Sequence, residues 1–316
     1  MMTLNREGYD MSKLTWRASF RKYGLIYLLL VPAVAVTFVF YYMPMPGIIA
    51  VFQDYNMFKG LLGSPMAANH GFAHVMEIFR LPAMKSAVIN TVYLSALTIL
   101  FTFPAPIILA LLLNELKGGL FKRLIQSVSY IPHFLSWISI IGIVMNLYSK
   151  YGLINDLRVL FGGPGTERVL FLSLPNFFVP NILILSVWQS IGWGSILFLA
   201  SIAGIDQALY ESAQIDGANR FQLARYVTLP GIMPTITIML IFTMGSLFNS
   251  NFDLVYGLQN AFINFEVINT VVFKTGIQQR SYSMAAAVGF MQGIVAFVLT
   301  FAANTISKKI NGIGVF

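Results

Sequence analysis

Long stretches without a charged residue alternate with short polar segments along this chain of 316 residues. Each stretch is close to or longer than the roughly 20 residues that a helix needs to cross a membrane. Helices also satisfy every backbone hydrogen-bonding group in lipid. The pattern therefore predicts an all-α integral membrane protein with six transmembrane helices. The predicted spans are residues 23–43, 86–113, 124–148, 178–203, 231–250 and 285–307.

The composition agrees with this fold class. Hydrophobic residues make up 57% of the chain and charged residues only 10%, against about 25% charged in soluble domains. The short alternating segments of a membrane β-barrel are not seen. The first stretch follows Arg17, Arg21 and Lys22, as a cleaved signal peptide would, but its length and an exit at Pro44 and Pro46 favour a retained span.

The basic residues predict the orientation, because Lys and Arg are retained on the cytoplasmic side. With both termini cytoplasmic, the tails 1–22 and 308–316 lie inside the cell and residues 23–307 form the transmembrane domain. The net charge is then +6 inside and +2 outside. The formal net charge of +8 follows mostly from this topology and calls for no nucleic-acid partner.

A polar loop, residues 206–230, joins the fourth and fifth predicted spans. Asp206 can cap a helix over residues 207–214, because its carboxylate accepts hydrogen bonds from free backbone N–H groups. Gly217 follows Asp216 and predicts a turn, since Gly adopts positive φ without steric cost.

The same loop contains a second predicted helix over residues 219–228, which Leu229 and Pro230 should end. Two short helices with apolar side chains suit insertion into a groove on a cytoplasmic partner. The alternative is a helical hairpin on the membrane surface.

A second group of polar and aromatic residues lies within the predicted spans. Gln189 and Trp193 are four residues apart and share a helix face next to Trp188, and Asn249 and Asn251 follow near the end of the fifth span. A sugar ring needs hydrogen-bonding groups for its hydroxyls and an aromatic plane for its C–H face. Two interpretations stay open: these residues line a solute path, or they pack between helices and end a helix.

Several kinds of chemistry lack the residues that they need. The chain has no Cys, and His70 and His74 have no carboxylate cluster beside them in the sequence, so we favour a solvated loop over a metal site. No predicted span contains Asp, Glu, Lys or Arg, which disfavours an ion-coupled carrier. A phosphate-binding G-x-x-x-x-G-K-[ST] loop is missing. We expect no enzyme and no cofactor in this chain, and energy supplied by another subunit.

The loop 206–230 carries a motif that resembles the permease subunits of binding-protein-dependent ABC importers of the maltose-permease type. Their signature is E-A-A, a Gly four residues later and, after nine further positions, a hydrophobic-x-Leu-Pro. Ser212 replaces the middle Ala. The residues in register are Glu211, Ala213, Gly217, Val227, Leu229 and Pro230.

The resemblance extends over nearly the whole chain. The segments L-L-N-E-L, Q-S-V-S-Y-I-P-H-F-L-S-W and G-W-G-S-I-L-F-L-A-S-I-A-G-I-D are similar to the branch that imports polysaccharide-derived oligosaccharides, which includes alginate-importer permeases. The resemblance implies a bacterial inner-membrane protein with four kinds of partner: a second homologous permease, two cytoplasmic ATPase subunits that bind ATP and Mg, an external solute-binding protein, and an oligosaccharide such as an alginate fragment.

The resemblance also assigns the loop as the element that couples to the ATPase. The residues that it implies are Glu211, Ser212, Ala213, Asp216, Gly217, Ala218, Leu229 and Pro230. A stand-alone six-helix channel or secondary carrier for a small solute is the alternative function.

Overall fold

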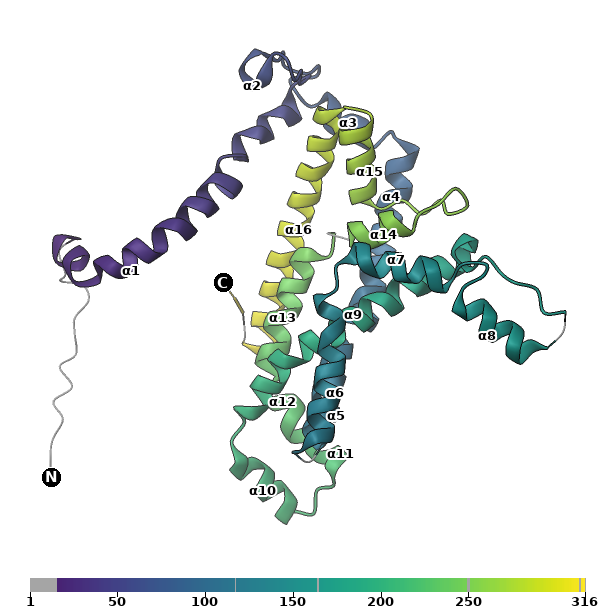
Figure 1. Ribbon diagram of the computed structural model, residues 1–316. Helices are drawn as coiled ribbons and strands as arrows, with labels where there is room; N and C mark the ends of the chain where they lie inside the picture. Colours follow the sequence, from purple (N-terminus) through teal and green to yellow (C-terminus); the bar gives the residue numbers. More distant parts are fainter. Residues whose placement is uncertain (1–15, 117, 164, 249–250, 313, 316) are drawn as a thin grey trace.

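The protein is all-helical in a computed structural model that describes residues 16–116, 118–163, 165–248, 251–312 and 314–315. Within these residues the extended pairing is a single isolated bridge between Gln53 and Met66. In the body of the molecule α5 (Pro104–Glu115) packs along α9 (Pro175–Ala203), and α13 (Met233–Ser246) packs along α16 (Tyr282–Asn311) (Figure 1). The predicted all-α fold is confirmed.

Among the described residues, four helices are long and apolar enough to cross a membrane unaided: Lys22–Phe52, Pro82–Glu115, Pro175–Ala203 and Tyr282–Lys309. Two further segments qualify as bent pairs, Leu120–Phe134 with Trp137–Leu147 at 101° and Arg220–Gly231 with Met233–Ser246 at 62°. Counting each bent pair as one span gives six, the number that the sequence predicts.

The elements of the first half of the chain are α1 (Trp16–Thr37), η2 (Phe38–Tyr42), η3 (Met45–Phe52), α2 (Gly60–Gly63), α3 (Ala73–Ile78), α4 (Pro82–Leu97), η4 (Thr98–Thr102), α5 (Pro104–Glu115), α6 (Leu120–Tyr130), η5 (Ile131–Phe134), α7 (Trp137–Leu147) and α8 (Leu153–Gly162). Those of the second half are η6 (Phe171–Ser173), α9 (Pro175–Ala203), α10 (Gln207–Ile215), α11 (Arg220–Leu223), η7 (Ala224–Thr228), α12 (Leu229–Gly231), α13 (Met233–Ser246), α14 (Phe252–Leu258), α15 (Ile268–Phe273), η8 (Lys274–Gln278) and α16 (Tyr282–Asn311).

Three wide π-helical turns, η2, η4 and η7, each end two residues before a proline: Pro44, Pro104 and Pro230. Proline donates no backbone hydrogen bond, and its ring collides with the carbonyl four residues earlier in a regular helix. A wide turn removes this conflict and lets the chain stay helical. Helical turns therefore continue past Pro44 and Pro46, where the sequence predicts the exit of the first span, to the end of η3 at Phe52.

The third predicted span, 124–148, is wrong as a single straight helix, because the chain bends by 101° between η5 and α7. Leu135 and Ser136 are extended at the bend. The Ser136 hydroxyl then accepts a hydrogen bond from the backbone N–H of Ser139 at 3.2 Å and caps α7. This capped break gives the chain a new direction between η5 and α7.

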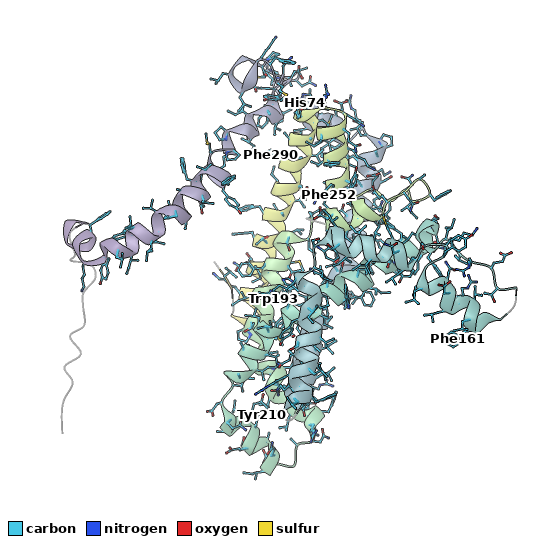
Figure 2. All side chains as sticks on the ribbon, in the orientation of Figure 1. His74, Phe161, Trp193, Tyr210, Phe252 and Phe290 are labelled. Atoms are coloured by element: carbon cyan, nitrogen blue, oxygen red, sulfur yellow. The ribbon has the colours of Figure 1, made fainter. Side chains whose placement is uncertain are left out.

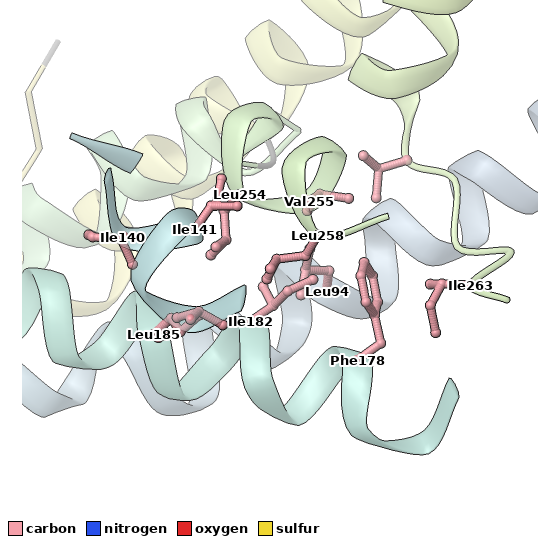
Figure 3. Packing of buried hydrophobic residues seen from close by; sticks show 12 residues of the cluster. Leu94, Ile140, Ile141, Phe178, Ile182, Leu185, Leu254, Val255, Leu258 and Ile263 are labelled. Atoms are coloured by element: carbon pink, nitrogen blue, oxygen red, sulfur yellow. The ribbon is translucent and has the colours of Figure 1, made fainter. Parts of the chain in front are cut away.

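Helix α9 lies at the centre of the packing. A cluster of buried residues joins it to α7 and α14 through Ile140, Ile182 and Leu254, each at most 2% exposed (Figure 3). A second cluster joins α9 to α5 and to the segment before α13 through Phe198 and Ile232. A third cluster packs α3, α4 and α15 on α16. Helix α9 is thereby fixed from two sides.

Helix α1 stands away from this body (Figure 1), and none of its most apolar stretch is buried. A groove of about 850 Å³ lies between η3 and α16 and is lined by Gly289 and Gly293. These glycines and Ala285 form a small-residue stripe, which predicts close helix packing. Within the described residues no atom of another helix lies within 4 Å of where a Cβ at Gly289 or Gly293 would stand, so these glycines face an open groove.

The sequence did not predict helix α8, which lies in a segment rich in turn residues. The buried Asn155 organises this segment: its amide donates to the carbonyls of Ser149 and Val169 at 2.9 and 2.8 Å, and its oxygen accepts from the N–H of Val169. One side chain thus closes the loop around α8.

Candidate functional site

The loop between α9 and α13 forms two short helices at one end of the molecule (Figure 1). The Asp206 carboxylate caps α10 by accepting the N–H of Ala208 at 3.0 Å, as the sequence predicts. Gly217 has φ +83°, which L side chains rarely adopt. The predicted turn between the two helices is confirmed.

The second helix begins with a capping box and extends farther than predicted. Asn219 accepts the N–H of Gln222 at 3.0 Å, and the Gln222 side chain accepts the N–H of Asn219 at 2.8 Å. The helical turns continue from α11 through η7 and α12 to Gly231. The helix passes Leu229 and Pro230 by one residue and ends at Gly231, where the chain bends by 62° before α13, so the predicted stop lies within one residue of the observed end.

Two side-chain contacts tie the loop together. The hydroxyl groups of Tyr210 on α10 and Thr228 on η7 lie 2.9 Å apart, and Thr228 is only 2% exposed (Figure 2 labels Tyr210). Arg220 reaches Glu115 at the end of α5 across 4.0 Å, which is a weak exposed pair. Tyr210 and Thr228 therefore join α10 directly to the segment that leads into α13.

The outer face of the loop carries large exposed apolar side chains. Ile215, Phe221 and Tyr226 are 86%, 72% and 68% exposed. Of the residues assigned to coupling, Glu211, Ser212, Asp216, Gly217 and Pro230 are exposed, and Ala213, Ala218 and Leu229 are half-buried. We call Ile215, Phe221, Tyr226 and the exposed coupling residues the loop surface. Large exposed apolar side chains in a polar loop are typical of a protein contact.

A cavity of about 390 Å³ opens between α5, η5, α9 and α13 and is lined in part by Thr102, His133, Gln189 and Trp193. A volume of this size falls in the range of about 300–1,000 Å³ that is usual for small-molecule sites. A second cavity of about 340 Å³ adjoins it and reaches Asn251. Both cavities share Thr98, Thr102, Gln189, Ser190 and Thr243.

The structure brings together Gln189, Trp193 and Asn251 of the predicted solute path. Trp188 lines neither cavity and is 44% exposed. Asn249 lies outside the described residues. Asn251 also caps α14, since its side chain accepts the N–H of Leu254 at 3.3 Å.

Two glycines shape the wall that carries Trp193 (Figure 2). A Cβ at Gly192 would stand 1.9 Å from the carbonyl oxygen of Ser129 on α6, and one at Gly194 would stand 2.8 Å from Pro106 on α5. Glycine at these positions lets α6 and α5 approach α9 closely. The two glycines on either side of Trp193 in the sequence therefore let α6 and α5 pack closely on the part of α9 that carries the indole.

Trp193 is part of an aromatic group at the bend before α7. The His133 ring stacks on it at 4.7 Å with an interplanar angle of 0°, and Phe134 meets it edge-on at 5.6 Å. The Gln189 amide donates to the carbonyl of His133 at 3.4 Å. Gln189 thus satisfies both sequence-based interpretations, because it bonds to a neighbouring segment and also lines the cavities.

Sequence reasoning missed His133 and Thr102 as cavity residues. Both are polar side chains inside long uncharged stretches, and polar groups at membrane depth usually face protein or water. That signal was available, but only the bend at η5 shows that His133 meets α9.

Other polar chemistry at these sites is limited. None of the described residues that line the two cavities is Asp, Glu, Lys or Arg. His74 lies 2.9 Å from the Asp54 carboxylate, and the described part of the chain has no group of three residues suited to hold a metal.

Comparison with known proteins places the chain among transport components. The family of binding-protein-dependent transport system inner membrane components matches residues 83–311. Protein LplB of Bacillus subtilis is 39% identical over 96% of this chain and 94% of its own length. The polygalacturonan/rhamnogalacturonan transport system permease protein YteP of Bacillus subtilis is 37% identical over 92% of this chain and 90% of its own.

A solved structure of the same kind is also similar. It is the crystal structure of a bacterial alginate ABC transporter in complex with an alginate pentasaccharide-bound periplasmic protein. One of its chains superposes with a TM-score of 0.83 at 33% identity, covering 94% of this chain and 98% of that one.

Proposed function

We infer the function from one premise: the chain belongs to the family of binding-protein-dependent transport system inner membrane components. It is a multi-pass membrane permease of the ABC transporter class and a transport component, not an enzyme. Membership also favours an importer subunit over a stand-alone channel or carrier. The subunit to which it couples and the solute that it transports are proposals.

We propose that the loop surface docks into a groove on a cytoplasmic ATPase subunit, which binds ATP and Mg. The observation that carries this proposal is the capped two-helix loop at one end of the molecule, with Ile215, Phe221 and Tyr226 exposed. Docked helices of this kind can pass a rigid-body movement to the spans. The Tyr210–Thr228 contact provides a direct connection towards α13.

The orientation that follows places both termini in the cytoplasm. The start of α1 and the end of α16 point towards the same end of the molecule as α10 (Figure 1). Six spans also return the chain to the side from which it began.

A second, homologous permease is the partner that we propose within the membrane. Two features support it: α1 stands clear of the body with its apolar stretch unburied, and the groove at Gly289 and Gly293 is open. Small residues allow another helix to approach closely. A paired permease would cover both surfaces.

The proposed cargo is an oligosaccharide that an external solute-binding protein delivers. YteP is named for polygalacturonan and rhamnogalacturonan, and the structural relative binds alginate through its periplasmic protein. In this chain, Trp193 offers an aromatic plane beside the Gln189 amide. Aromatic planes and neutral hydrogen-bonding groups suit sugar rings, and an alginate-type fragment is the leading candidate.

Co-purification tests the proposal most directly. The chain should bring down an ATPase subunit from detergent extracts, and the double substitution Gly217→Pro with Glu211→Lys should abolish both that association and uptake. Gly204→Ala, at the end of α9 just before the loop, is the matched control, since a Cβ there meets only ordinary contacts. An intact association in the double variant would sink the proposed docking site.

A further inference from the structure

Two polar atoms in the central cavity have no partner. The Thr102 hydroxyl and the Nδ1 atom of His133 are buried and make no hydrogen bond to any described residue. Both side chains line the cavity of about 390 Å³. Buried polar groups in proteins nearly always have a partner, so each exception calls for a physical reason.

Neighbouring polar side chains in the same cavity are satisfied by their own helices. Ser190 donates to the carbonyl of Ser186 at 2.6 Å, and Thr243 donates to that of Met239 at 2.8 Å. Thr102 is a threonine in a helical stretch like Thr243 but makes no such bond. The wide turn η4, which ends at Thr102, changes the spacing of the carbonyls below it. Its hydroxyl is left without an acceptor in the wall of the cavity.

Both side chains share the cavity with an aromatic platform, Trp193. His133 stacks on the Trp193 ring at 4.7 Å, and Trp193 remains 47% exposed. The cavity thus has one aromatic plane and two neutral hydrogen-bonding atoms in its walls.

The chemistry of the cavity selects the kind of group that it can bind. A hydroxyl both donates and accepts, so it can pair with a threonine hydroxyl and with either tautomer of a histidine. None of the described lining residues is Asp, Glu, Lys or Arg, so the cavity gives a sugar carboxylate no charged partner of either sign. Its neutral hydrogen-bonding atoms suit the ring hydroxyls that acidic and neutral sugars share.

We propose that Thr102 and His133 bind hydroxyl groups of a sugar ring that stacks on Trp193, and that this subunit recognises hydroxyl pattern but not charge. The inference rests on the proposed function. It assigns the discrimination between acidic and neutral oligosaccharides to other parts of the transporter.

Uptake by the complete transporter in proteoliposomes, with its ATPases, second permease and binding protein, tests the inference. The probes are an oligogalacturonide and its methyl-esterified form, which has the same ring hydroxyls without the charge. Thr102→Val and His133→Phe should each lower the maximal uptake rate about three- to tenfold, the effect of one lost hydrogen bond. The loss should be equal for the two probes, and the concentration of loaded binding protein that gives half-maximal rate should not change.

Conservative variants separate recognition from folding. Thr102→Ser and His133→Asn keep a hydrogen-bonding atom and should restore most of the rate. Thr300→Val is the control outside the cavity, because its hydroxyl is already bonded to the carbonyl of Ala296 at 2.8 Å. Unchanged uptake in Thr102→Val and His133→Phe, a loss that the conservative variants share, or a loss confined to the acidic probe would each overturn the inference. If the wild-type complex moves neither probe, the proposed cargo itself is wrong, and that outcome is distinct from the others.

Discussion

The loop surface and the central cavity are built in opposite ways. The loop geometry depends on contacts between residues close in sequence: an Asp206 cap, a turn at Gly217 and an Asn219–Gln222 capping box. The cavity is assembled from α5, η5, α9 and α13, which lie far apart in the sequence. A substitution in the loop should therefore weaken function only partly. A substitution where two helices of the cavity wall are in contact should disrupt the cavity itself.

Gly192→Ala is the severest test of that difference. The added Cβ would overlap the Ser129 carbonyl, so α6 and α9 would have to separate. We expect a loss of about 3 kcal/mol, the upper part of the range for overpacked cores. The yield of assembled complex in size-exclusion chromatography and its unfolding temperature measure this loss.

Gly142→Ala is the matched control for Gly192→Ala. It is also a glycine within a helix, but nothing lies within 4 Å of its added Cβ. We expect it to leave the unfolding temperature unchanged or slightly higher, since Ala favours a helix. Equal effects of the two substitutions would show that the approach of α6 to α9 is not critical.

Gly217→Ala tests the loop. An L residue with φ near +83° costs about 1–2 kcal/mol, which corresponds to roughly tenfold weaker ATPase association. The complex should still form at high ATPase concentration, because the spans are untouched. A binding titration with purified ATPase measures the shift, and association of wild-type strength in this variant would contradict it.

The sequence was informative where structure is local. Uncharged stretches predicted the all-α membrane fold, and the polar loop predicted its own cap and turn at Asp206 and Gly217. It was less informative where a proline stands next to a wide turn. A π-helical turn before Pro44 and another before Pro230 carry the helical turns past each proline, to Phe52 and Gly231, and the uncharged pattern alone does not predict these turns.

The cavity was only partly predictable for a related reason. The spacing of Gln189 and Trp193 places them on one helix face, but no local pattern shows which segment that face meets. The 101° bend brings His133 onto Trp193, and its angle depends on tertiary packing. Trp188 is the complementary case: it stands next to Gln189 in sequence yet lines neither cavity.

The two tryptophans provide a smaller and more selective test of the cavity. Trp193→Leu removes the stacking plane, which is worth about 0.5–1.5 kcal/mol beyond simple burial, so uptake should fall about fivefold. Trp188→Leu should leave uptake within about twofold of wild type, since its ring lies off the cavity. Rates of oligosaccharide uptake in proteoliposomes distinguish the two, and a reversed order would assign the platform to Trp188.

Tyr210→Phe should have the smallest effect, and it examines how the loop communicates with the spans. The substitution removes only the contact with the Thr228 hydroxyl, which can still donate to the carbonyl of Leu223 at 3.3 Å. The cost should therefore be at the low end for a hydrogen bond, about 0.5 kcal/mol. Because the contact joins α10 to the segment leading into α13, we expect ATPase binding to be unchanged and the number of solute molecules moved per ATP to fall about twofold. Parallel measurements of uptake and phosphate release give that ratio.

Thr228→Val removes the other partner of the same contact and should lower the ratio similarly, whereas a ratio unchanged in both variants would show that the movement passes through the helical backbone alone.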